Sequence, residues 1–315
     1  MTEDLDAVLS ERRILLSLAY RMTGTLADAE DIVQETYVRW YRLGADERAG
    51  IENVGGWLTR TASRIALDVL GSARRRRERY IGQWLPEPVS ADLFAGTAPA
   101  TGGSVTAGAL AADPLERVTL DDAISTALLI VLEAMTPAER VAFVLHDVFG
   151  MPFAEISDIV GRSPAAVRQL AASGRRHVRE SRTSLVPRAD HDAAVRAFRA
   201  ASQTGDIDQL MRVLAPDVQL RSDGGGVVNA APNVVAGADR VARFLLGIGA
   251  KDPELVSDEQ PLGDGLGLVI RVGETPMGVM SFHVEGGLIT DVWIMLNPAK
   301  LTVWLPTPSG AIPNR

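Results

Sequence analysis

The chain has 315 residues, a formal net charge of −8 and 46% hydrophobic residues, which leaves room for two or three globular domains. It has no cysteine, so disulfides and thiolate metal sites are excluded, and its four histidines lie far apart in the sequence. We therefore expect no metal and no other cofactor. No apolar run approaches the roughly 20 residues of a membrane span, and the acidic start lacks a signal-peptide pattern. These features predict a cytoplasmic protein that does not contact a membrane.

Apolar residues at three- and four-residue intervals predict helices over 5–22, 28–42 and 57–79. In the second helix an apolar stripe leaves other faces polar, and a solvated surface is the simplest interpretation of that polarity. The polar positions are Asp31, Gln34, Glu35 and Arg39.

Basic residues gather in two segments, although the whole chain is acidic. The first lies within residues 60–80, in the third helix, which ends in the run RRRRER; its arginines include Arg60, Arg64, Arg74, Arg75, Arg76 and Arg77. The second lies within 162–188. A run such as RRRRER can be a disordered arm, but here it continues an amphipathic helix. Two basic segments in an acidic chain favour two contacts with nucleic acid, whose affinity would fall with salt.

Residues 152–182 are typical of a helix–turn–helix. Gly161 can take the positive φ that ends a helix, and Ser163 followed by Pro164 is a strong start for the next one. The second helix would turn Val167, Leu170 and Val178 inward. Its outward residues suit base edges and phosphates, and they are Arg168, Gln169, Arg175 and Arg176. An ordinary helical hairpin with a basic surface is the alternative. Upstream, helices are expected over 115–134 and after Thr136, which opens a capping box with Glu139.

Between the two basic units, residues 83–113 are expected to form a flexible linker, because they combine two prolines with an Ala/Gly/Ser/Thr-rich tract. The linker opens with WLPEP, which contains Trp84, Leu85 and Pro86. We expect its Trp and Leu to dock on protein, since leaving apolar area in water is unfavourable by roughly 25 cal/mol per Å².

After residue 187 the pattern changes to helices over 189–215, with a break at Gly205-Asp206, and then to strands. The expected strands are 218–221, 267–272, 278–284 and 289–295, with a helix over 239–248 and a hairpin turn at Gly286-Gly287. This order predicts an α+β domain with a mainly antiparallel sheet.

AEDIVQET, then WLTRTASRIALD with its arginine run, then the helix–turn–helix resemble the bacterial extracytoplasmic-function sigma factors in order and spacing. The resemblance implies two all-α sigma domains, sigma-two over 1–82 and sigma-four over 114–186. It implies that Asp31, Gln34, Glu35 and Arg39 face core RNA polymerase at the β′ clamp helices, and that sigma-four meets the β flap. The basic residues and Ser163 would face promoter DNA. Arg64 stands where many such factors have Asn, so minus-ten selectivity is expected to differ.

The C-terminal third resembles the SnoaL-like polyketide-cyclase family, which implies a cone-shaped α+β domain over 187–300, followed by a tail over 301–315. Asp223, Gly224, Gly225 and Gly226, then Asn297-Pro298-Ala299-Lys300, and the WLPEP box resemble motifs of sigma factors that carry this domain. Val227 stands where those factors have a basic residue. With Trp84, Leu85 and Pro86, the Asp-Gly-Gly-Gly residues are the expected contacts for regulation between domains; a plain surface loop is the alternative.

The leading hypothesis is thus a transcription initiation sigma factor, regulated in cis by its C-terminal domain, and not an enzyme. One alternative is a one-component, ligand-responsive DNA-binding regulator that never touches polymerase. Another is a small-molecule enzyme tethered to DNA, for which Asp223, His283 and Asp291 are the candidate acids and bases. Their spacing favours structural roles. Whether the C-terminal pocket binds a small-molecule ligand stays an open question.

Overall fold

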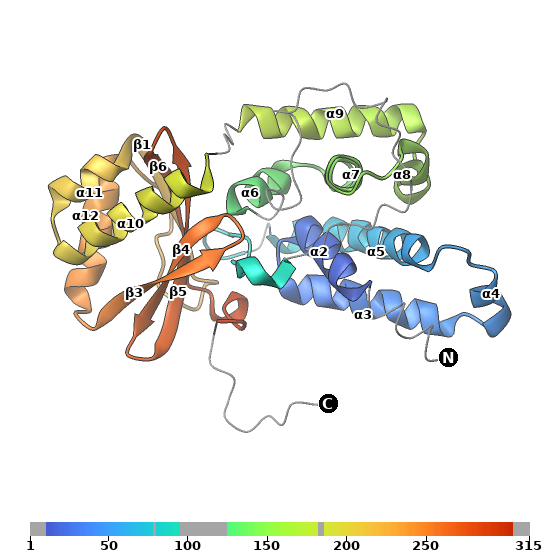
Figure 1. Ribbon diagram of the computed structural model, residues 1–315, viewed down its shortest axis with the longest axis horizontal. Coiled ribbons are helices and arrows are strands. Elements are labelled where there is room, and N and C mark those ends of the chain that lie inside the picture. Colours follow the sequence, from blue (N-terminus) through green and yellow to red (C-terminus); the bar gives the residue numbers. More distant parts are fainter. Residues whose placement is uncertain (1–10, 78–79, 95–124, 182–185, 305–315) are drawn as a thin grey trace. The chain divides into compact units, whose positions relative to one another are not determined.

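The structure is a computed structural model that describes residues 11–77, 80–94, 125–181 and 186–304 (Figure 1). Its residues form two compact units. One unit combines residues 1–78 with 94–183, and the other combines 79–93 with 184–315. Part of the segment expected to be linker therefore packs with the C-terminal residues.

The first half of the helical unit contains α2 (Arg12–Thr23), α3 (Leu26–Arg42), α4 (Ala45–Ala49) and α5 (Val54–Arg77). Gly24 ends α2 in the left-handed conformation, and the Thr25 side chain accepts a hydrogen bond from the Asp28 amide at the start of α3. The apolar stripe predicted for the second helix is confirmed, because Ile32 and Trp40 are buried. The short helix α4 was not predicted, and residues 5–10 of the first expected helix lie outside the described residues.

The second half of this unit contains α6 (Thr126–Ala134), α7 (Pro137–Phe143), a π-helical turn (Val144–Val148), α8 (Phe153–Val160) and α9 (Pro164–Glu180). The capping box predicted at Thr136 is present, since the Glu139 side chain accepts from the Thr136 amide at 2.9 Å. Residues 115–124 of the helix expected before it lie outside the described residues. The π-helical turn was not predicted.

The other unit holds α10 (Arg188–Thr204), α11 (Ile207–Val213), α12 (Ala238–Lys251) and one six-stranded sheet. The sheet order is β2-β1-β6-β5-β4-β3, and the pairs are antiparallel except β1 with β6. The strands are β1 (Leu214–Asp223), β2 (Val235–Ala236), β3 (Leu255–Leu262), β4 (Gly265–Val272), β5 (Thr275–Glu285) and β6 (Leu288–Met295). The helix break at Gly205-Asp206 and the hairpin turn at Gly286-Gly287 are confirmed, with positive φ at the three glycines.

The three helices cover one face of this sheet (Figure 1), and the core lies between them. Phe198 of α10 meets Phe282 of β5 edge to face, with ring centroids 5.0 Å apart. Because side chains alternate along a strand, Phe282 and Val292 point into this core, whereas their neighbours His283 and Asp291 point to the opposite face.

Candidate functional site: polymerase and nucleic-acid interfaces with a C-terminal clasp

The polar positions predicted on α3 are presented together on its surface. Asp31 and Gln34 are exposed, while Ile32 and Val33 between them are buried. Glu35 pairs with Arg39 one turn later, Oε1 to Nε at 3.0 Å. This i, i+4 pair is exposed, so it adds only a few tenths of a kcal/mol to the helix. The face is therefore a rigid, mostly acidic surface on an anchored helix.

Helix α5 carries the first basic group. Arg60 and Arg64 are exposed on the same side, one turn apart. Arg64 Nη2 donates to the Asp158 carbonyl at 3.3 Å, and Arg60 Nε lies 3.8 Å from the Glu155 carboxylate. Both partners belong to α8, the first helix of the helix–turn–helix. Arg74, Arg75, Arg76 and Arg77 lie on the last turn of α5, but their side chains fall outside the described residues.

The helix–turn–helix itself forms as the sequence predicts. Gly161 has φ +68°, and the Ser163 hydroxyl accepts from the Ala166 amide at 3.3 Å, which starts α9. Val167 is fully buried, while Leu170 and Val178 are only half-buried. The exposed face of α9 carries Arg168, Gln169 and Arg176.

Arg168 stacks on an aromatic platform: its guanidinium carbon lies 5.7 Å from the centroid of Phe153. Phe153, the first residue of α8, stacks in turn on His146, with centroids 3.8 Å apart. His146 Nδ1 lies 3.1 Å from the Met151 carbonyl, which fixes the ring. This stack could not be predicted from the sequence.

Arg175, predicted to face DNA, is engaged within the protein. Its Nη1 donates to both carboxylate oxygens of Asp147, at 2.8 and 3.1 Å. Burial raises the pKa of Asp147, and the Arg175 charge opposes that rise. The pair connects α9 to the π-helical turn, so Arg175 helps to orient the recognition helix.

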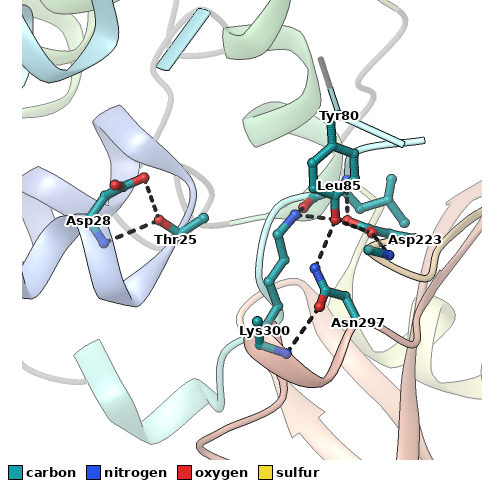
Figure 2. Close-up of polar contacts among 9 residues, drawn as sticks. Thr25, Asp28, Tyr80, Leu85, Asp223, Asn297 and Lys300 are labelled. Carbon is teal, nitrogen blue, oxygen red and sulfur yellow. Dashed lines mark hydrogen bonds and ion pairs between the residues drawn. The ribbon is translucent and has the colours of Figure 1, made fainter. Parts of the chain in front are cut away.

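In the C-terminal unit, three segments far apart in the sequence meet at Asp223 (Figure 2). We call this cluster the clasp; it consists of Tyr80, Trp84, Leu85, Asp223, Asn297 and Lys300. The Asp223 carboxylate, which is fully buried, accepts from Lys300 Nζ at 2.8 Å and from the Leu85 amide at 3.0 Å. It also accepts from the Tyr80 hydroxyl at 2.5 Å and the Gly225 amide at 3.0 Å.

Lys300 is the cation of the clasp and is itself buried. Besides Asp223 it donates to the Leu85 carbonyl at 2.6 Å, and its Nζ lies 4.2 Å from the centroid of Trp84. Asn297 donates to the Tyr80 hydroxyl at 2.8 Å. Burial, and then the hydrogen bond to Asp223, raise the pKa of Tyr80, which keeps the phenol protonated. Every charge in the clasp thus has an opposite charge or a donor.

Residues 80–90, which we call the strap, run from the end of β1 to the end of β3. At the far end the Gly263 amide donates to the Val89 carbonyl at 3.2 Å, and Ser90 pairs with Leu262. Leu85, Pro86 and Val89 are buried. The docking expected for Leu85 of WLPEP is confirmed, and the site is the C-terminal sheet.

Two of the three glycines after Asp223 are required sterically. A Cβ on Gly224 would lie 2.1 Å from the Val228 carbonyl oxygen. Gly225 has φ +65°, and its Cβ would lie 2.5 Å from Asn297 Cγ. The glycine run therefore allows the loop after β1 to pack closely against Asn297. The sequence pointed to Asp223, but it did not single out Tyr80 as its partner.

Of the three candidate acids and bases, Asp223 belongs to the clasp, and the other two pair across β5 and β6. The Asp223 carboxylate accepts hydrogen bonds from the four donors described above. His283 and Asp291 lie on the sheet face opposite the helices, where burial raises the pKa of Asp291. The helix-covered core is made of apolar side chains. Among the described residues, no group of three or more His, Cys, Asp or Glu side chains could hold a metal ion, and no helix there is long and apolar enough to cross a membrane.

Two family models match the helical unit, Sigma-70 region 2 over residues 7–78 and Sigma-70 region 4 over residues 125–178. The helical unit therefore has the two core regions of a sigma-70-type factor. We use region 2 and region 4 for these two parts below.

Relatives cover almost the whole chain. It is 39% identical to the ECF RNA polymerase sigma factor SigJ of Mycobacterium tuberculosis, over 92% of this chain and 91% of that protein. It is 37% identical to the probable ECF RNA polymerase sigma factor SigI of the same species, over 93% of this chain and 92% of the relative. The SigJ crystal structure aligns with a TM-score of 0.69 at 32% identity, covering 96% of this chain and 98% of SigJ. The chain belongs to the extracytoplasmic-function RNA polymerase sigma factors.

The expected fold class is confirmed, with helical sigma regions followed by a C-terminal α+β domain.

Proposed function

We propose that this chain is a transcription initiation factor that binds core RNA polymerase and directs it to specific promoters. The observation that carries the proposal is the combination, in one chain, of an exposed acidic face on α3 and a helix–turn–helix with a basic recognition face. A one-component regulator would need only the second of these. Because a sigma factor works with polymerase, the proposal places the chain in the cytoplasm.

For docking, we assign Asp31, Gln34, Glu35 and Arg39 to the β′ clamp helices, and region 4 to the β flap. Exposed charges at such a surface set association rate and specificity more than raw affinity. The test is the affinity of the full chain for purified core polymerase. Asp31→Ala with Glu35→Ala is expected to weaken it at least about tenfold. Asp46→Ala with Glu52→Ala, also exposed but outside α3, is the matched control and is expected to bind normally. Equal affinity of both variants would remove α3 as the docking face.

For promoter DNA, we assign two groups of residues. Arg60, Arg64 and the Arg74–Arg77 run would contact the minus-ten region, and α9 would enter the major groove of the minus-thirty-five element. On α9, Arg168 and Gln169 would contact base edges, and Ser163 and Arg176 would contact phosphates. Arg175, which pairs with Asp147, would orient the helix. Each lost phosphate contact is expected to lower the salt slope of binding by about one.

We further propose that the C-terminal domain regulates this activity in cis and has no catalytic role. The clasp supports this proposal, because it fixes on the C-terminal sheet the chain that immediately follows region 2. Opening of the clasp would release the chain after region 2 from the C-terminal sheet. Asp223→Asn in the full chain is therefore expected to change run-off transcription per bound factor. Unchanged output, with an opened strap shown by faster amide exchange at 80–90, would refute regulation in cis.

A further inference from the structure

The strap leads directly into a short 3-10 helix (Ala91–Phe94), and its last residue enters the helical unit. Phe94 is 3% exposed there. Its ring centroid lies 5.2 Å from that of Tyr20 on α2. The guanidinium carbon of Arg21, the next residue of α2, lies 5.7 Å from the same centroid. The chain after the strap thus places an aromatic side chain against region 2.

Arg21 extends this contact to region 4. Its guanidinium carbon also lies 5.8 Å from the centroid of Phe149, which follows the π-helical turn. The side chain is 1% exposed, and its Nη1 donates to both the hydroxyl and the carbonyl of Ser17. A buried guanidinium held by a hydrogen-bonded serine and contacted by two aromatic rings has little freedom to move. We call Tyr20 and Arg21 of region 2 the Phe94 socket; Phe149 of region 4 contacts the same Arg21.

A second buried arginine connects the same regions one residue further along α2. Arg140 of α7 donates to the Met22 carbonyl at 2.7 Å and to Glu133 at 2.6 Å. Burial lowers the pKa of Arg140 to about 9, so the side chain remains charged at neutral pH. Arg60 and Arg64 of region 2 likewise contact α8 of region 4. Two of the arginines predicted to contact promoter DNA, Arg60 and Arg64, therefore contact α8 while the regions stay together.

We propose that Phe94 is an autoinhibitory plug: packed on Arg21, it braces the Arg21–Phe149 contact that joins regions 2 and 4, and so favours the arrangement in which Arg60 and Arg64 contact α8. Only three residues separate Phe94 from Ser90, which pairs with the C-terminal sheet. Movement of the strap on that sheet would consequently pull on the plug. This inference deepens the proposed regulation in cis, and rests on it for its biological meaning, by naming the contact through which the C-terminal domain acts.

The test compares Phe94→Ala with wild type in the full chain. Because the chain has no cysteine, Asp68→Cys and Glu180→Cys, both at exposed positions in regions 2 and 4, give a unique pair of spin-label sites. Removing the ring removes its cation–π contact with Arg21, so the closed-to-open equilibrium is expected to shift by up to about 30-fold. The distance distribution between labels should then broaden toward longer values. Asp92→Ala, an exposed residue of the same 3-10 helix, should leave it unchanged.

The second measurement is affinity for a fork-junction DNA with a short single-stranded tail. Binding limited by a minor open state strengthens as that state becomes populated, so Phe94→Ala should bind more tightly, by up to about 30-fold. The sign is diagnostic, because a variant that merely misfolds would bind more weakly. Phe94→Leu, which keeps apolar bulk but loses the ring, should fall between wild type and Phe94→Ala. In an Arg60→Ala/Arg64→Ala background the gain should disappear.

Unchanged distances and unchanged affinity in a folded Phe94→Ala protein would overturn the inference. Weaker binding with unchanged distances would also overturn it. Longer distances without DNA binding by any variant, wild type included, would instead count against the proposed function and leave the plug intact.

Discussion

Lys300→Met tests the energetic logic of the clasp. The Lys300 side chain is 8% exposed and that of Asp223 is 0% exposed, so the substitution removes one member of a buried ion pair. The carboxylate would keep its donors from Tyr80, Leu85 and Gly225 but lose its counter-charge. Breaking a buried pair from one side costs about 3–5 kcal/mol. With three donors left, we expect the lower end, about 3 kcal/mol.

For a unit of this size, about 3 kcal/mol corresponds to a fall of roughly 6–12 °C in the thermal midpoint of the C-terminal transition, measured by calorimetry. Asp223→Leu combined with Lys300→Met removes both charges and should recover much of the loss, because an ion pair replaced by apolar groups is often neutral in stability. A Lys300→Met protein within 1 °C of wild type would refute this account of the clasp. So would a double variant less stable than the sum of the single ones.

Three further predictions concern other described contacts. Phe153→Leu should weaken promoter binding several-fold by releasing Arg168, and in an Arg168→Ala background it should have no further effect; additive losses would exclude the platform. Gly225→Ala should destabilise the C-terminal unit by about 2 kcal/mol or more, through positive φ plus the clash with Asn297, whereas Gly286→Ala, whose Cβ meets open space, should cost only about 1 kcal/mol; equal losses in urea unfolding would contradict the steric argument. Burial raises the pKa of Asp291, so its contribution to stability is present below the ordinary value of about 4 and is lost as pH rises through the folded value. Asp291→Asn should therefore raise the thermal midpoint at pH 7 more than at pH 4, with the exposed Asp217→Asn as control; an equal change at both pH values would contradict the sign.

Local signals in the sequence predicted local structure well. Gly161, Ser163 and Pro164 placed the turn and the start of α9, because the conformations they favour are fixed by their own covalent structure. Helical periodicity likewise placed α3 and α5. The acidic and basic faces followed from the same periodicity.

Contacts over long sequence separations could not be predicted in this way. Tyr80 and Asp223 are 143 positions apart, and neither sits in an apolar or charged pattern that indicates the other. Strand β3 was missed because Asp258, Glu259, Gln260 and Pro261 lack apolar alternation, and its exposed positions need none at a sheet edge. The Asp147–Arg175 pair was missed for the same reason as the clasp. An arginine on a recognition helix looks the same in sequence whether it meets a carboxylate or a phosphate.

The most direct test of the central claim is transcription from genomic fragments by purified core polymerase, with 5′ ends mapped, in the presence and absence of the full chain. The account predicts start sites that appear only when the chain is added and that weaken with Asp31→Ala/Glu35→Ala. Sequence-specific DNA binding by the chain, with the same start sites in its absence and no association with core polymerase, would contradict it.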